Sequence, residues 1–206
     1  ILSGDIGGDD WANPALEAGQ IVGENAYTVV TALACPPQTV LDGFVISGGQ
    51  SDADSEGTNT WGGGLFIDYF GPTIRNCRIQ GNFARNGGGA YIAWSTAPRF
   101  RDCQFIGNKA NRGAGVFSSF GASPTFAFCD FAGNDASLIV DAPIPTAGGG
   151  AKGGALQPPE ANFGQEGGGI YGEGWFSASG KRAAGSLGSE DANGFAIEGE
   201  GISHCG

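Results

Sequence analysis

The chain has 206 residues, of which 40 are glycine and none is methionine, and its 21 acidic and 10 basic residues give a net charge of −11. This much glycine excludes a helical bundle or coiled coil, because each glycine costs a helix about 1 kcal/mol. Collagen is excluded because glycine does not recur at every third position. A hydrophobic content of 40% argues against disorder. No run of about 20 apolar residues is present, so we expect no membrane span.

The beginning of the chain is already strand-like. Residues 1–5 read ILSGD, with no charged-then-apolar leader, and we expect a processed segment of a secreted protein. A weak copy of a later repeat covers residues 41–49, where Phe44 occupies the position that cysteine takes in later copies and Gly49 the position of asparagine.

Three clear copies of a 26-residue repeat follow. They read PTIRNCRIQGN at 72–82, PRFRDCQFIGN at 98–108 and PTFAFCDFAGN at 124–134. Cysteine recurs at Cys77, Cys103 and Cys129, and asparagine at Asn82, Asn108 and Asn134. A glycine-rich motif with an aromatic residue at its end travels with the repeat, at 62–66, 87–91, 113–117 and 167–171. Several coincidences at one period predict a stacked repeat architecture.

The pattern inside one repeat predicts short strands. Ile74, Cys77 and Ile79 alternate with polar residues, and the alternation slips once near Asn76, which indicates a corner. We therefore predict an all-β parallel β-helix formed as a single domain over 1–206. It would have five to six coils of two or three strands, with regular coils over 39–134. Residues 135–206 would form an irregular coil, with a Gly/Ala/Pro-rich insertion at 135–165. The cysteines would stack as an interior ladder and the asparagines as a corner ladder.

This pattern resembles the right-handed parallel β-helix repeats of the pectate-lyase-like superfamily. The pairing of residues 88–91 (GGAY) with FIGN at 105–108 and FAGN at 131–134 also resembles the repeats of chlamydial polymorphic outer-membrane proteins. The resemblance implies a right-handed coil and an extracellular or cell-surface location. Catalysis on this fold usually means action on a polysaccharide.

Charge is divided into three blocks. Residues 1–74 hold ten acidic residues and no lysine or arginine, residues 75–112 hold seven basic residues and one acidic residue, and the rest is acidic again. The central block contains a basic strip, Arg75, Arg78, Arg99 and Arg101. The strip either neutralises the neighbouring acidic coils or binds an anionic polymer or an acidic neighbouring subunit. Nucleic acid is disfavoured as a partner by the acidic whole.

The candidate metal and thiol chemistry is limited. Asp52, Asp54 and Glu56 match the first half of a calcium loop, but the closing glutamate is missing, so calcium is a candidate and no other cofactor is expected. The three repeated cysteines are read as buried free thiols, with a disulfide between adjacent coils as the alternative. Whether Cys35 pairs with Cys205 stays open.

An aromatic face is the remaining prediction. Phe66, Tyr91, Phe117 and Tyr171 follow inward-facing residues of the glycine-rich motif and should point outwards. They would be covered by the 135–165 insertion, form a subunit contact or offer a platform for sugars.

The functional prediction is a non-catalytic structural or adhesive module that self-assembles at a cell surface or in a filament. A polysaccharide lyase, hydrolase or carbohydrate-binding relic is the alternative. No catalytic residues are assigned, because Asp42, Asp68, Asp102 and Asp130 form no obvious carboxylate pair.

Overall fold

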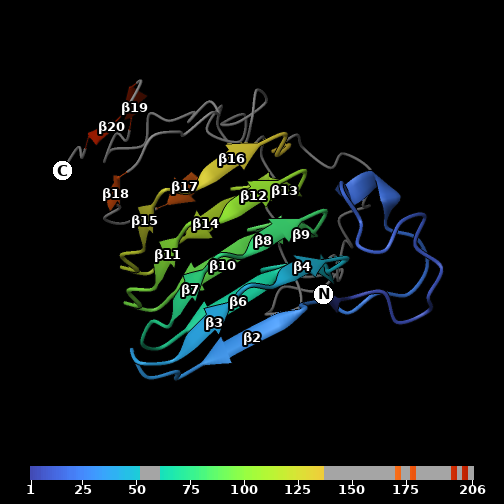
Figure 1. Cartoon of the computed structure of the whole chain (residues 1–206), viewed down its shortest axis with the longest axis horizontal. Helices are drawn as coiled ribbons and strands as arrows, with labels where there is room; N and C mark the ends of the chain where they lie inside the picture. Colours follow the sequence, from blue (N-terminus) through green and yellow to red (C-terminus); the bar gives the residue numbers. More distant parts are fainter. Residues whose placement is uncertain (52–60, 137–169, 173–176, 180–195, 199–200, 204–206) are drawn as a thin grey trace, which may run out of the picture.

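The computed structural model describes residues 1–51, 61–136, 170–172, 177–179, 196–198 and 201–203. Their strands stack into an all-β parallel solenoid, as predicted, whose strands repeat in register over about four coils (Figure 1). The prediction of two or three strands per coil is wrong, because a complete coil supplies four. The strand that was missed follows the repeated asparagine, where only a small alanine, Ala84 or Ala110, faces inwards.

Four parallel sheets run along the solenoid, numbered here in the order in which a coil visits them. Sheet I contains β2 (Val30–Leu33), β6 (Leu65–Asp68), β10 (Ala90–Ala93), β14 (Val116–Ser118) and β17 (Ile170–Gly172). Sheet II contains β3 (Val40–Asp42), β7 (Thr73–Arg75), β11 (Arg99–Arg101), β15 (Thr125–Ala127) and β18 (Ser177–Ser179). Sheet III contains β1 (Leu2–Ser3), β4 (Val45–Ser47), β8 (Arg78–Gln80), β12 (Gln104–Ile106) and β16 (Asp130–Ala132). Sheet IV contains β5 (Gln50–Ser51), β9 (Phe83–Asn86) and β13 (Lys109–Arg112).

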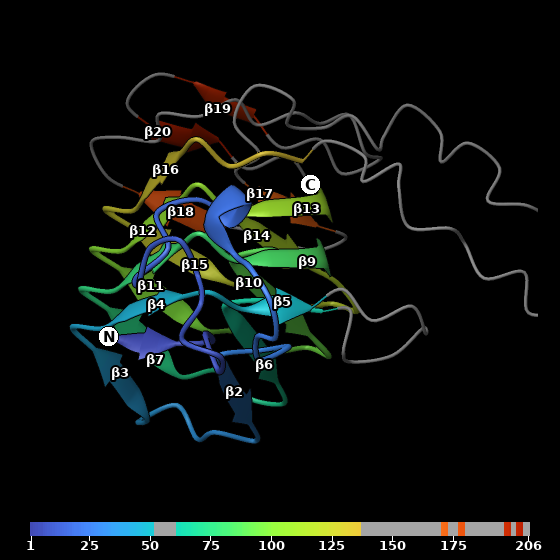
Figure 2. The ribbon, with the colours of Figure 1, turned by 90° about the vertical axis from the view of Figure 1, so that its right-hand side faces the viewer.

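Two elements lie outside these sheets. A short 3-10 helix, η1 (Ala18–Gln20), belongs to the N-terminal segment, which runs along the side of the stack (Figure 2). The amide of Ala18 donates to the carbonyl of Gly107, and the Gln80 side chain donates to the carbonyl of Ala15. Near the C-terminus, β19 (Ala196–Glu198) and β20 (Gly201–Ser203) pair antiparallel to each other, unlike the strands of the four sheets.

The register follows the 26-residue period of the sequence. Phe100 pairs with Ile74 and Phe126, and the same spacing aligns the inward residues of sheet III. The weak early copy is also in place, since Val45 pairs with Arg78 and thereby brings Phe44 level with Cys77. Its spacing to the next copy is longer because the extra residues lie between β5 and β6.

The interior of the solenoid is a single apolar core filled by stacked side chains. Phe105 is fully buried and its ring stacks on that of Phe131 with centroids 4.7 Å apart. Phe100 stacks in the same way on Phe126 at 5.0 Å. The rings of two adjacent coils stack because in-register parallel strands place equivalent side chains directly above one another, and Ile74 and Ile79 hold these positions in the coil before.

The asparagines form a buried ladder at the corner between sheets III and IV. The Nδ2 of Asn82 donates to the Oδ1 of Asn108 at 3.0 Å, and Asn108 donates to Asn134 at 2.9 Å. Each amide also donates to a backbone carbonyl, which for Asn108 belongs to Ile79. The ladder thus joins three coils through polar groups that water does not reach.

Left-handed backbone marks the corner between sheets II and III. Asn76, Asp102 and Phe128 have φ of 50°, 52° and 56° at equivalent positions, and Gly43 has 78° in the first coil. Asparagine and aspartate tolerate this region, but it is strained for a bulky residue. Phe128 is also 52% exposed, so its side chain gains little from packing.

Replacing Phe128 by glycine is therefore expected to raise the free energy of unfolding by about 0.5–1 kcal/mol, because glycine relieves the positive φ at an entropic cost smaller than the strain. Urea denaturation of the purified chain measures the change. Phe128→Ala is the matched control, since it removes the ring and keeps the strain, and it should give no gain. A loss of stability in Phe128→Gly would show that contacts of the ring outweigh the strain.

Candidate functional site

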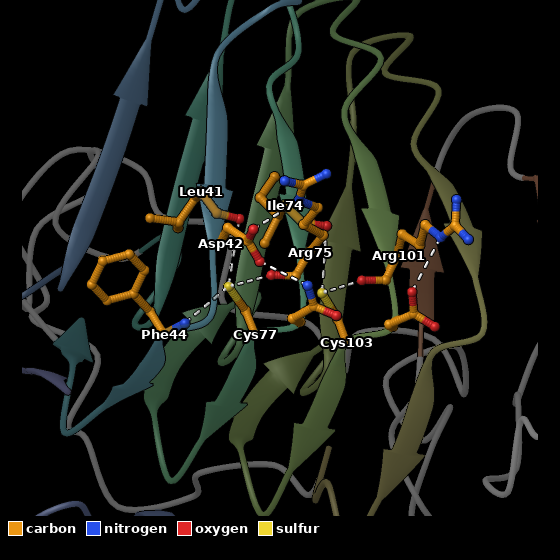
Figure 3. Close-up of polar contacts among 10 residues, drawn as sticks. Leu41, Asp42, Phe44, Ile74, Arg75, Cys77, Arg101 and Cys103 are labelled. Carbon is orange, nitrogen blue, oxygen red and sulfur yellow. Dashed lines mark hydrogen bonds and ion pairs between the residues drawn. The ribbon is translucent and has the colours of Figure 1, made fainter.

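The candidate site lies at the same corner, where the thiol ladder meets the basic strip (Figure 3). Cys77, Cys103 and Cys129 follow the left-handed residues, point inwards and are buried. All three thiols are free, as is that of Cys35. Cys205 lies outside the described residues, so its pairing stays open.

Each ladder thiol makes the same local contact. The thiol donates to the carbonyl two residues before it, at 3.1 Å from Cys77 to Arg75 and 3.3 Å from Cys103 to Arg101. Contact with the Cys129 thiol, together with burial, raises the pKa of Cys103 to about 12, and contact with Cys103 lowers the pKa of Cys129. The pKa of Cys77 is raised by its contact with Cys103 and by burial. The raised pKa values of Cys77 and Cys103 disfavour the thiolate, which is the reactive form of cysteine.

The four arginines of the basic strip lie on the outer faces of sheets II and III, in two adjacent coils. Arg75 pairs in register with Arg101, and Arg99 begins the same strand as Arg101. Arg78 lies just past the corner, on β8. All four side chains are exposed, and the four arginines that the sequence analysis assigned to one basic strip lie on adjacent coils.

Two of these arginines are paired with carboxylates. Arg75 Nε lies 2.9 Å from Asp42 Oδ2, and Arg101 Nε lies 3.1 Å from Asp102 Oδ2. Asn76 donates to the other oxygen of Asp42, and this bond, together with Arg75, lowers the pKa of Asp42 against the opposing effect of desolvation. Both pairs are exposed, and such pairs stabilise a fold by at most about 1 kcal/mol.

Arg78 and Arg99 are free of such partners. Within the described part of the chain, no carboxylate forms an ion pair with either guanidinium group. Asp130 belongs to the strand row that contains Arg78 but lies two coils away, with Gln104 between them. The strip is therefore half neutralised, and its two free cations lie on neighbouring coils.

The aromatic face forms as predicted but is not exposed to solvent. Phe66, Tyr91 and Phe117 point away from the interior core, as predicted, but they are covered and only 6%, 3% and 5% exposed. They form a second apolar cluster with Ala93, Trp61 and Trp94. Trp61 stacks on Tyr91 with centroids 4.8 Å apart, although its position outside the repeat gave no sign of this contact. Tyr171 pairs in register with Phe117 through its backbone.

A neighbouring stack of aromatic rings is exposed at the corner after sheet I. Tyr69, Trp94 and Phe120 lie one above another, with centroids 6.4 and 5.1 Å apart and nearly parallel rings. Tyr69 and Phe120 are more than half exposed. Because the rings cover one another's faces, mainly their edges meet solvent, which does not suit stacking against a sugar ring.

Asp68 is a buried carboxylate that sequence reasoning named only as a scattered acid. It is 8% exposed, its Oδ1 has no hydrogen-bond partner among the residues that the structure describes, and burial raises its pKa. It is the sole carboxylate in the strands of sheet I. No sequence signal distinguishes it from the other scattered acidic residues.

The calcium candidates Asp52, Asp54 and Glu56 lie outside the described residues. Among the residues that the structure does describe, no three His, Cys, Asp or Glu side chains are grouped as a metal site requires. The described part of the chain likewise has no helix that is both long and apolar enough to cross a membrane.

Comparison of the chain with protein-family models, with curated proteins and with solved structures gives no significant match. The fold and the site thus define a class of architecture, the parallel β-solenoid repeat protein.

Proposed function

We propose that this chain is a non-catalytic structural and adhesive module of the right-handed β-helix type, acting in an extracellular or cell-surface assembly. The observation that carries the proposal is that the residues conserved between the repeats stack on one another inside the solenoid. Phenylalanine, cysteine and asparagine recur where they stack from coil to coil, and these stacked side chains are buried in the described coils. What the repeat preserves is therefore a rigid rod with flat outer faces.

The carboxylates support the same proposal. A glycosidase needs two of them in different protonation states on either side of one bond. Asp42 and Asp102 each bind an arginine, and the lowered pKa of Asp42 disfavours the proton that a general acid must carry. Asp68 has the raised pKa that a general acid needs, but no second carboxylate lies on its sheet among the described strands.

A second candidate function is the binding of an anionic polysaccharide along the basic strip. Arg78 and Arg99 favour it, because a guanidinium group that has no internal partner is available to carboxylates or sulfates of a ligand. The strip crosses the two coils laterally, as an extended polymer would require.

Binding to polygalacturonate, alginate and heparin by affinity chromatography and calorimetry tests the second candidate. The double variant Arg78→Gln, Arg99→Gln should bind about tenfold more weakly, because each exposed charge contact contributes about 0.5–1 kcal/mol. Arg112→Gln is the matched control, since it removes a charge from the same basic block on sheet IV and should bind as the native chain does.

The same polymers serve to test catalysis. Absence of cleavage, with and without calcium, is the result expected of a non-catalytic module, and release of unsaturated or reducing ends would overturn the proposal. Equal binding by the native chain and the double variant would remove the basic strip as a ligand site.

A further inference from the structure

Asp68 is a buried carboxyl group that neither of the functions discussed above uses. It ends strand β6 and is only 8% exposed. Its Oδ1 has no hydrogen-bond partner among the described residues, and none of them forms an ion pair with it. A carboxylate oxygen that is buried without a partner is costly, because it loses its water and nothing replaces the lost hydrogen bonds. The neutral and the ionised form of Asp68 therefore fit this position unequally.

Asp68 lies at the edge of the second apolar cluster. Its register neighbours in sheet I are Leu33 of β2 and Ala93 of β10, and Figure 1 shows β2, β6 and β10 side by side. Ala93 belongs to the cluster, and so does Phe66. Phe66 shares the outer face of β6 with Asp68, because side chains two residues apart on a strand point the same way. Apolar side chains thus border the carboxyl group on its own strand and on both neighbouring strands.

No positive charge faces Asp68 from the described elements packed against it. Strand β2 carries no titratable side chain, and β10 carries only the phenol of Tyr91. The corner after β6 adds the phenol of Tyr69, and the corner after β2 adds the thiol of Cys35. None of these three groups can become a cation, so none can offset an ionised Asp68. Burial accordingly raises the pKa of Asp68, against the smaller opposing effect of a backbone hydrogen bond from Tyr69.

A polar group in the same row of the sheet is satisfied two coils further on. Ser119 continues the row of Asp68 and Ala93. Its hydroxyl lies 2.9 Å from the hydroxyl of Tyr91, which belongs to the preceding coil. At the matching place before Asp68 stands Thr31, and no hydrogen bond joins it to Oδ1 of Asp68. The outer face of sheet I thus supplies a partner for the serine but none for this oxygen of the aspartate.

We propose that Asp68 is a pH-sensitive switch for the packing of the second apolar cluster. In acid, the neutral carboxyl group stays in place at the edge of the cluster. As the pH rises, the carboxyl group gives its proton to solvent, and the carboxylate gains water only when the outer layer of sheet I loosens around it. That water is close at hand, because Tyr69, the next residue, is 57% exposed.

The effect on stability has a definite direction. An aspartate with a raised pKa in the folded state contributes its full stability below the ordinary aspartate pKa of about 3.9, where it is neutral in both states. As the pH rises through the folded-state pKa, this contribution is lost, because the unfolded chain ionises first. Asp42 has a lowered pKa and works in the opposite direction, so the switch is measured as the difference between the native chain and a variant of Asp68.

Urea unfolding of the full chain between about pH 4 and about pH 8 tests the switch. Asp68→Asn keeps the shape of the side chain but cannot ionise, so its stability relative to the native chain should increase with pH. The limit is a tenfold change in the ratio of the two unfolding constants per pH unit, because one proton is involved. Asp130→Asn, on the outer face of sheet III, is the matched control, and its difference from the native chain should vary less with pH.

The near-ultraviolet circular dichroism of the folded chain reports on the loosening itself, because it depends on fixed packing of aromatic rings. The cluster contains the stacked rings of Trp61 and Tyr91. Their signal should weaken as the pH rises in the native chain and stay constant in Asp68→Asn. If Asp68→Asn does not fold, Asp68→Ala replaces it with the same expected results, since the next coil has alanine at this place.

Two outcomes would overturn the switch. One is a stability difference between the native chain and Asp68→Asn that is constant or falls as the pH rises. The other is a near-ultraviolet signal that changes with pH equally in both chains. Neither measurement involves a polysaccharide or an assembly, so failure of the switch is distinguishable from failure of the proposed function.

Discussion

Phe105→Ala is expected to lower the free energy of unfolding by about 4 kcal/mol, the largest effect of any single truncation considered for this chain. Phe105 is fully buried, stacks on Phe131 and makes edge contacts with Phe100 and Phe126. Its removal opens a cavity between two neighbouring coils, because Phe131 loses its stacking partner and Ile79 loses the side chain opposite it. Equilibrium unfolding in urea, followed by circular dichroism, measures the change.

The matched control is Phe120→Ala. Phe120 belongs to the exposed aromatic stack and is 53% exposed, so its truncation should cost less than about 1 kcal/mol. If the two variants lost stability equally, the distinction drawn here between the interior stack and the outer stack would be wrong.

Asn108→Ala is expected to destabilise the chain by about 3 kcal/mol. Its Nδ2 donates to Ile79 and Asn134, and its Oδ1 accepts from the backbone amide and the side chain of Asn82. Alanine leaves these buried groups without partners, and each buried group that loses its hydrogen bond costs about 1–3 kcal/mol. The loss should appear as a lower urea midpoint with an unchanged slope.

Gln104→Ala is the control for the asparagine ladder. Gln104 lies half-buried on the outer face of the same coil, outside the ladder, and its truncation should change stability by about 0.5 kcal/mol or less. A loss in Asn108→Ala no greater than that would mean that water replaces the ladder at little cost.

The 26-residue period predicted the ladders because stacking in register demands the same residue type at the same place in each coil. The period alone predicts that Cys103 and Asn108 lie on ladders, and both do. The strands of sheet IV were missed because their inward residues, such as Ala84, are too small to produce a visible alternation.

The candidate site was predictable only in part. The spacing of Arg75 and Arg101 indicated a shared face, and the structure pairs them in register. The ion pair of Arg75 with Asp42 spans 33 residues, so a search at the 26-residue period does not find it. The burial of Tyr91 was not predictable either, because a residue that faces away from the core is exposed only if nothing else packs on it, and Trp61 does so here.

The unequal coil lengths show where this scaffold accepts new sequence. Sheet IV is connected to sheet I by three residues between β9 and β10 and by three between β13 and β14. Between β5 and β6 the connection has thirteen residues. The strands that follow these connections still pair in the same register. A still longer connection begins after Asp135, which bridges to Lys109 of sheet IV, and ends at β17 of sheet I, so it spans the same corner. Within a strand, by contrast, a single inserted residue would turn every following side chain to the opposite face. The corner between sheets IV and I is thus a place where a loop of different length can be grafted while the stacked strands keep their register.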